Sequence, residues 1–192
     1  MKKLILFVAV ISTGLLAFKP IANIWSVDNA HSKLGFEITH LMLTDIEGSF
    51  KNVESKITAS KADFSDAVVE LTADVNSVNT DNEKRDAHLK AADFFDAEKY
   101  PKLTFKSTSF KKVGNNKYKV AGNLNFHGVT KPVTLDAVLK GINVNESTKK
   151  ETAGFKVTGT IKRSDFNFGS KYPTAMLSNE VNLNANVQFG KN

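Results

Sequence analysis

The sequence predicts an all-β domain, and three features lead to this prediction. Apolar residues alternate with polar ones through most of the chain beyond residue 25, which is the period of a strand with one buried face. Residues typical of turns separate these runs at 114–116 (GNN), at Gly128 and over 143–150. A single segment departs from this period and has the spacing of a short helix.

Every second residue of each predicted strand belongs to the buried face. The residues that share a face are Leu34, Phe36 and Ile38; Val69, Leu71, Ala73 and Val75; Tyr118, Val120, Leu124 and Phe126; Val133, Leu135, Ala137 and Leu139; Phe155, Val157 and Ile161; and Val181, Leu183, Ala185, Val187 and Phe189. Such strands, joined by polar turns, predict an all-β meander. A closed barrel and two stacked sheets would both bury one face, so the period does not choose between them.

The helical segment is predicted over residues 81–96. Residues 80–83 (TDNE) have the T-x-x-E form of a capping box, and apolar residues follow at a spacing of four from Ala87 to Phe95. The ring of Pro101 disfavours helical geometry in the residue before it, so the helix should end there at the latest.

The N-terminus has the composition of a secretory signal peptide. Two lysines precede an apolar stretch over residues 4–18, and Lys19-Pro20 follows it. A stretch of about 15 apolar residues is shorter than the roughly 20 that a bilayer span needs. We therefore predict a signal peptide over residues 1–22, cleaved near Ala22, and one β-barrel domain over residues 23–192. An uncleaved anchor is the alternative.

Composition excludes several classes of protein. The chain has no cysteine, which excludes a disulfide framework, a thiolate metal site and a lipid-modified N-terminal cysteine. The whole chain has 26 basic and 20 acidic residues, and loss of the three lysines of the signal segment leaves 23 basic residues and a net charge of +3. These charges are scattered along the chain, so the sequence predicts no nucleic-acid partner.

The chain is rich in phenylalanine, with 14 residues, and several fall on the buried faces of predicted strands. Such residues suit an elongated apolar cavity as well as a filled core. The strand pattern alone favours the filled core, because most aromatic-rich protein interiors are closely packed.

Three stretches of the chain carry longer motifs. They are residues 28–41 (DNAHSKLGFEITHL), residues 82–101 (NEKRDAHLKAADFFDAEKYP), and residues 124–133 (LNFHGVTKPV) together with 161–166 (IKRSDF). The first resembles the D-x-x-H-S-x-x-x-F-x-x-x-H opening of the YceI-like, polyisoprenoid-binding proteins. The others resemble the central signature and the third and fourth conserved blocks of that family, and only residues 167–173 (NFGSKYP) depart from its pattern.

The resemblance implies a lipocalin-like antiparallel β-barrel with a long internal tunnel, a short capping helix and export to the bacterial periplasm. It implies that the protein carries or stores a polyisoprenoid or an isoprenoid quinone, without a cofactor and without catalysis. A transient contact with a membrane surface is compatible with that role. Two alternatives are an enzyme acting on an isoprenoid-type lipid and a filled structural barrel that contacts an envelope protein.

Candidate ligand-binding residues follow from the strand faces and the capping segment. The predicted apolar wall consists of Phe36, Ile38, Leu41, Phe94, Phe95, Phe105, Phe126 and Phe155. Glu37, next to Phe36 in the same strand, should face solvent. Lys84, Arg85 and His88 are candidates for contact with a lipid phosphate or quinone head group, and the alternative is that these charges are solvated at the helix start.

Metal binding and nucleophilic catalysis are not predicted. The chain has four histidines, at His31, His40, His88 and His127. None belongs to an H-x-x-x-H or H-E-x-x-H pair, so no metal site is expected. Asp28, His31 and Ser32 have the residue types of a hydrolase triad, but the sequence lacks a G-x-S-x-G elbow or an equivalent, which argues against this chemistry.

Overall fold

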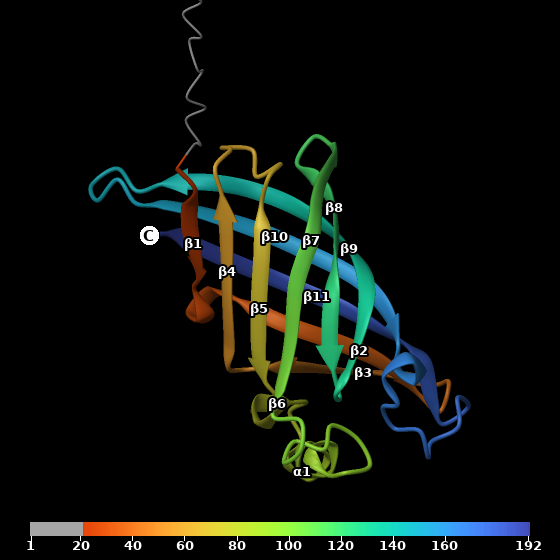
Figure 1. Ribbon diagram of the computed structural model, residues 1–192. Helices are drawn as coiled ribbons and strands as arrows, with labels where there is room; N and C mark the ends of the chain where they lie inside the picture. Colours follow the sequence, from red (N-terminus) through yellow and green to blue (C-terminus); the bar gives the residue numbers. More distant parts are fainter. Residues whose placement is uncertain (1–20) are drawn as a thin grey trace, which may run out of the picture.

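The computed structural model describes residues 21–192, which form one antiparallel sheet wrapped into a barrel (Figure 1). The predicted signal segment lies outside the described residues up to position 20. The strands are β1 (Asn23–Val27), β2 (Lys33–His40), β3 (Thr44–Phe50), β4 (Val53–Ala59), β5 (Val68–Asp74), β6 (Val78–Asn79), β7 (Lys102–Gly114), β8 (Lys117–Phe126), β9 (Val129–Val144), β10 (Glu151–Lys162) and β11 (Leu177–Lys191). The helices are α1 (Glu83–Lys90) and the short 3-10 turns η1 (Asn29–His31), η2 (Val75–Ser77) and η3 (Arg163–Phe166).

The barrel closes between its first and last strands. Within the described chain the order is β1-β4-β5-β7-β8-β9-β10-β11, and β11 pairs in turn with β1. Strands β2, β3 and β6 continue the sheet from the same edge of β11, beyond the part that β1 occupies. Figure 1 shows β9, β10 and β11 running obliquely behind β4, β5 and β7. The all-β prediction is confirmed, and the open choice between barrel and sandwich is settled in favour of the barrel.

Alternation along the strands decides which side chains face the interior. In β8, Tyr118, Val120, Leu124 and Phe126 are buried, while Lys119 and Asn123 between them are exposed. The next strands repeat this pattern, because antiparallel register places inward residues opposite one another, as with Val120 and Leu135. The inner face is therefore a continuous apolar surface.

Helix α1 is shorter than predicted, since it covers Glu83–Lys90 and not residues 81–96. Its N-cap is Asn82, whose side-chain oxygen accepts from the backbone N–H of Arg85 at 3.0 Å, so the predicted capping role of Thr80 is wrong. Beyond the helix the chain forms irregular turns that bury Phe94 and Phe95 together. Neighbouring residues point about 100° apart on a helix, so a continued helix would not have buried both.

One end of the barrel is closed by the loop between β4 and β5. Phe64 is 1% exposed and has a φ of 57°, and its ring packs 5.2 Å from the rings of both Trp25 and Phe155. The hydroxyl of Tyr118 donates to the carbonyl of Asp63 at 2.6 Å, which holds the loop against the end of the barrel. Burial raises the pKa of Tyr118, so this hydroxyl keeps its proton.

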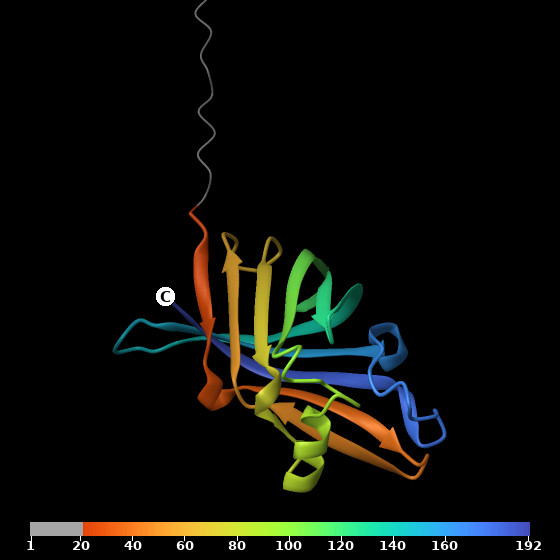
Figure 2. The same ribbon diagram turned by 60° about the horizontal axis from the view of Figure 1, so that its bottom comes forward.

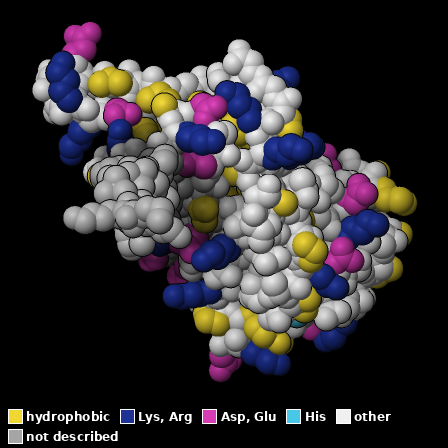
Figure 3. Space-filling view, turned by 45° about the horizontal axis from the view of Figure 1, so that its top comes forward, with side chains coloured by type: hydrophobic (Ala, Val, Ile, Leu, Met, Phe, Trp, Pro, Cys, Tyr) yellow, Lys and Arg dark blue, Asp and Glu magenta, His cyan; other side chains and the backbone are white. Residues whose placement is uncertain are grey.

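The outer face of the barrel carries both signs of charge. In the view of Figure 3, lysines and acidic residues alternate over the strands without forming a block of one sign. Glu70 bridges Lys56 and Lys106 at 2.7 and 2.8 Å across three neighbouring strands. These two lysines hold the pKa of the Glu70 carboxyl at about 2, so it is ionised at neutral pH.

No helix within residues 21–192 has the length and apolar character that a bilayer crossing requires.

Candidate functional site

The interior of the described barrel contains a cavity of about 690 Å³. This volume falls within the roughly 300 to 1,000 Å³ of small-molecule sites. Aliphatic and aromatic side chains from the barrel strands make up most of its wall, and the segments around residues 85–95 and 168–177 line its mouth. The filled core that the strand pattern alone favours is therefore not what the described chain contains.

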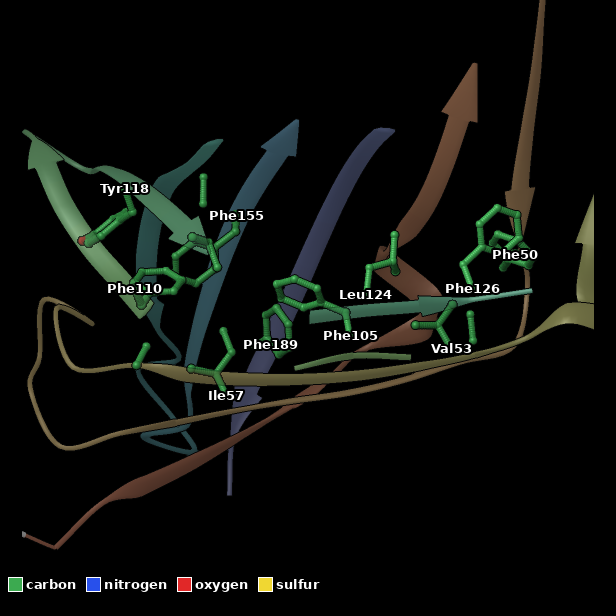
Figure 4. Packing of buried hydrophobic residues seen from close by; sticks show 14 of the residues in the cluster. Phe50, Val53, Ile57, Phe105, Phe110, Tyr118, Leu124, Phe126, Phe155 and Phe189 are labelled. Atoms are coloured by element: carbon green, nitrogen blue, oxygen red, sulfur yellow. The ribbon is translucent and has the colours of Figure 1, made fainter. Parts of the chain in front are cut away.

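Aromatic rings mark the two ends of this cavity (Figure 4). Phe110 and Phe155 lie at the closed end, where Phe110 packs 4.8 Å from Tyr118. Phe50 and Phe126 lie toward the mouth, where each packs on Phe95, at 5.6 and 5.7 Å. Leu124, Phe105 and Phe189 are placed between these groups in the same view. The cavity is thus elongated along the barrel.

Inward-facing glycines let large rings lie against the barrel wall. A Cβ at Gly48 would sit 2.2 Å from the ring of Phe36, and a Cβ at Gly122 would sit 2.4 Å from the ring of Phe105. Each ring therefore occupies the space of the missing side chain on the neighbouring strand. This arrangement keeps these two rings against the wall and leaves more space in the middle of the barrel.

A group of polar side chains lies at the mouth beside α1. The side chain of Arg85 donates from Nε to the hydroxyl of Thr80 and from Nη2 to its carbonyl, both at 2.7 Å. Asp86 accepts from the backbone N–H of Thr80 at 2.9 Å and from its hydroxyl at 2.6 Å. Because Thr80 and Arg85 both line the cavity, this network holds a guanidinium at its rim.

An aromatic cluster forms the neighbouring part of the mouth. Phe94 and Tyr172 stack with their centroids 4.8 Å apart, and His88 packs edge-on against Phe94 at 5.0 Å. The hydroxyl of Tyr172 lies 3.4 Å from Nε2 of His88. Outside this cluster Lys171 pairs with Asp93 at 2.5 Å and lowers the pKa of that carboxyl. The loop before β11 is thereby joined to the segment after α1.

Arg163 holds that loop in place. Its side chain is 4% exposed, and it donates to the carbonyls of five residues at 2.6 to 3.2 Å. They are Phe168, Gly169, Tyr172, Leu177 and Ser178. Burial lowers the pKa of the guanidinium, and the carbonyl dipoles compensate its loss of water. Residues 167–177 therefore take a defined path over the mouth.

The structure places most of the predicted binding residues on the cavity wall. Those that line it are Phe36, Ile38, Phe94, Phe95, Phe105, Phe126 and Phe155, with Arg85 and His88 at the mouth. Leu41 does not line it, because the strand has ended and the turn leaves this side chain 46% exposed. Lys84 is exposed on α1 and does not line it either. Glu37 does not line the cavity, and its carboxylate accepts a hydrogen bond from Nδ2 of Asn182 at 3.1 Å.

Several residues of the mouth were not predicted from the sequence. His40 and Thr44 line it at the ends of β2 and β3, and Tyr172 and Met176 line it from the loop before β11. Arg163 lies in the IKRSDF stretch of residues 161–166, but its role depends on carbonyls as far along the chain as Ser178. Local sequence carries no signal for such a set of partners.

The histidines and the apparent triad have structural contacts. Nδ1 of His31 lies 2.8 Å from the carboxylate of Asp28, but the hydroxyl of Ser32 donates to the carbonyl of Gln188. The nucleophile and base of a hydrolase are therefore not hydrogen-bonded to each other here. Within residues 21–192 no three side chains of His, Asp or Glu are grouped as metal ligands.

The fold and the site define a class of protein, an antiparallel β-barrel that encloses an apolar cavity with a polar group at its mouth. The YceI-like domain profile matches residues 25–189, and the chain belongs to the YceI-like family. A UPF0312 protein of Staphylococcus aureus (strain N315) is 36% identical over 169 residues, which is 86% of this chain and 96% of that protein.

Solved structures share the same architecture. Burkholderia cenocepacia BcnA has a TM-score of 0.76 at 28% identity, covering 84% of this chain and 98% of that chain. The YceI protein of Campylobacter jejuni has a TM-score of 0.73 at 34% identity, covering 100% and 99%. A polyisoprenoid-binding domain from Saccharophagus degradans, at 17% identity, covers 88% and 98% with a TM-score of 0.63, which concerns the fold alone.

Replacing Arg163 should destabilise the protein strongly. We expect Arg163→Met to lower the free energy of unfolding by about 3 kcal/mol or more, because five carbonyls lose a charged donor in a buried site. Urea denaturation measures this, with the exposed neighbour Lys162→Met as the control. Equal stability of the two variants would contradict the proposed tether.

Adding a methyl group at Gly48 should reduce the capacity of the cavity. In Gly48→Ala the new Cβ would displace the ring of Phe36, whose atoms are its three nearest neighbours, from the wall into the interior. We expect weaker binding of the apolar fluorescent probe N-phenyl-1-naphthylamine, by about tenfold for a loss of roughly 1.4 kcal/mol. Gly190→Ala is the matched control, since nothing lies within 4 Å of its Cβ position. Unchanged probe affinity in Gly48→Ala would refute this account of the hollow interior.

Proposed function

We propose that this protein binds a long isoprenoid-type lipid, a polyisoprenoid or an isoprenoid quinone, in its internal cavity. The observation that carries the proposal is the cavity of about 690 Å³ with an almost wholly apolar wall. Apolar walls favour a ligand that buries hydrocarbon, and the elongated shape favours a chain over a compact molecule. Membership of the YceI-like family supports the isoprenoid class.

The fold neighbour from Saccharophagus degradans is a polyisoprenoid-binding domain, which supports the use of this architecture for such a ligand. At 17% identity that resemblance is one of fold, so the proposal for this chain depends on its own wall residues.

The energetics of burying such a tail favour reversible carriage of the lipid over its permanent capture. About forty buried carbons, at roughly 0.8 kcal/mol each, would nominally exceed 30 kcal/mol relative to water. Non-covalent affinities do not exceed about 18 to 21 kcal/mol. The relevant reference state is a lipid in a membrane, whose tail is already out of water, so transfer into the cavity is close to an even exchange.

The mouth supplies the polar contacts for a head group. Arg85 and His88 line it, with the hydroxyl of Tyr172 beside the imidazole. Nε and Nη2 of Arg85 are engaged with Thr80, which orients the guanidinium. A guanidinium suits a phosphate oxygen, and the imidazole and the phenol suit a quinone carbonyl. The apolar wall would then accept the tail, while these groups select the head.

Binding without catalysis is the proposed activity. The titratable side chains that line the cavity are His40, Arg85, His88 and Tyr172, and they belong to the segments around its mouth. The tail of a bound lipid would therefore meet apolar groups along most of its length. An enzyme acting on the head group is the competing function, and turnover of an extracted lipid by the purified protein would support it instead.

Solvent extraction followed by mass spectrometry tests the carrier role. We expect an isoprenoid-type lipid to be recovered from the protein, and Phe126→Gln to reduce its occupancy, because an unpaired amide against the tail costs about 1 to 3 kcal/mol. Val157→Gln repeats the test at a half-buried wall position. This second variant keeps the test valid if Phe126→Gln does not fold.

Glu37→Gln is the matched control, since Glu37 does not line the cavity. A protein that yields no lipid, or wall variants that fold and keep full occupancy, would remove the basis of the proposal.

We further propose that the protein acts in the bacterial periplasm. The two lysines and the apolar stretch of the first 18 residues support export. We expect N-terminal sequencing of protein from the periplasmic fraction to find a first residue between Phe18 and Trp25. Retention of Met1 on the protein in that fraction would contradict cleavage.

A further inference from the structure

Exposed apolar side chains gather at the turn between β2 and β3. Leu41, Met42 and Leu43 are 46%, 75% and 80% exposed, and Met176 beside them is 41% exposed. The backbone N–H of Leu41 donates to the carbonyl of Met176 at 2.9 Å, so the four residues form one surface, here named the apolar tip. Ten large apolar residues of the described chain are exposed to this degree, and four of them are in this tip.

The backbone of the turn does not favour these residues. Leu41 and Met42 have φ angles of 53° and 57°, in the left-handed region that asparagine and glycine adopt most easily. None of Leu41, Met42 and Leu43 belongs to the hydrophobic core of the described chain. An Asn-Gly turn would suit both the left-handed backbone and exposure to water, so neither the fold nor the turn requires large apolar side chains here.

The apolar tip adjoins the mouth of the cavity. His40 and Thr44, which flank the turn, line the cavity, as do Met176 and Leu177. Leu177 pairs with His40 across the sheet. Figure 2 shows the β2–β3 turn beside the loop that precedes β11, at the end of the barrel where α1 lies. Any surface that covers the tip therefore lies next to the mouth.

The chemistry and shape of this region identify the surface. Residues 41–44 and 172–179 contain no charged side chain. A stable protein partner would need roughly 800 Å² on this side, which a narrow hairpin turn does not offer. A lipid bilayer needs no matching surface, and apolar side chains bury about 5 to 10 Å into its headgroup boundary.

We propose that the apolar tip inserts into the surface of a lipid bilayer and holds the mouth of the cavity against it. The lipid then passes between membrane and cavity with its tail shielded from water. This inference deepens the proposed carrier function and rests on it for the identity of the cargo. Because the four residues of the tip are uncharged, their contact with the bilayer is apolar, and the protein should bind vesicles of neutral phosphatidylcholine in the absence of anionic lipid.

Vesicle flotation with phosphatidylcholine tests the proposal on the exported protein. The variant Leu41→Asn/Met42→Gly/Leu43→Ser removes the apolar side chains and places residues that the left-handed backbone favours at 41 and 42, so we expect it to keep its fold. We expect the vesicle-bound fraction to fall at least fivefold. The matched control is Ile142→Ser/Val144→Ser, which removes exposed apolar residues from the β9–β10 hairpin and should bind as the wild type does.

Several results would overturn the docking role. They are a wild type that does not float with vesicles, a tip variant that floats equally well, and self-association of the wild type through the tip in place of vesicle binding, detected by light scattering.

Measuring the intact mass of each protein ensures that all variants share one N-terminus. Lipid extraction from the same samples separates the two proposals, since a tip variant that retains its lipid but not its vesicle binding supports both. A protein that binds vesicles but yields no lipid refutes only the carrier function.

Discussion

Closure of the sheet by β11 is the constraint on which the rest of the structure depends. One edge of this strand pairs with β10, and its other edge pairs with β2 and then with β1. The turn η1 separates those two short strands and lets them share the edge. With both edges paired, β11 joins the ends of an eight-strand ring, whose width admits either packed side chains or one small ligand. Strand number alone does not decide which.

Side-chain placement makes the interior hollow. The ring of Phe36 lies over Gly48 and that of Phe105 over Gly122, so bulk is taken up at the wall. Side chains along a cavity wall make fewer dispersion contacts with one another than those of a packed core. Aromatic packing at the two ends offsets part of this difference, with Phe64 at the closed end and Phe95 toward the mouth. A bound lipid would add contacts along the wall and stabilise the fold by mass action.

The mouth differs from the closed end in what holds it together. At the closed end Phe64 packs among aromatic rings and a single hydrogen bond from Tyr118 holds its loop. At the mouth an aromatic cluster is joined by two polar networks, from Arg163 to the loop before β11 and from Arg85 to Thr80. Hydrogen bonds fix direction more strictly than apolar contact does, so these networks give the rim of the cavity a defined shape. That combination suits a site that must select a polar head while accepting a flexible tail.

The sequence by itself determined which faces of the strands turn inward, because a period of two follows from the geometry of the extended backbone. Phe36, Phe105 and Phe155 were placed on the wall by that reasoning. Only the tertiary structure decided that the barrel is hollow and that Leu41 lies outside it, since both depend on packing between strands and on where a strand ends. It also decided the length of α1 and the partners of Arg163, because burial of adjacent phenylalanines and hydrogen bonds across 15 residues of chain leave no periodic trace.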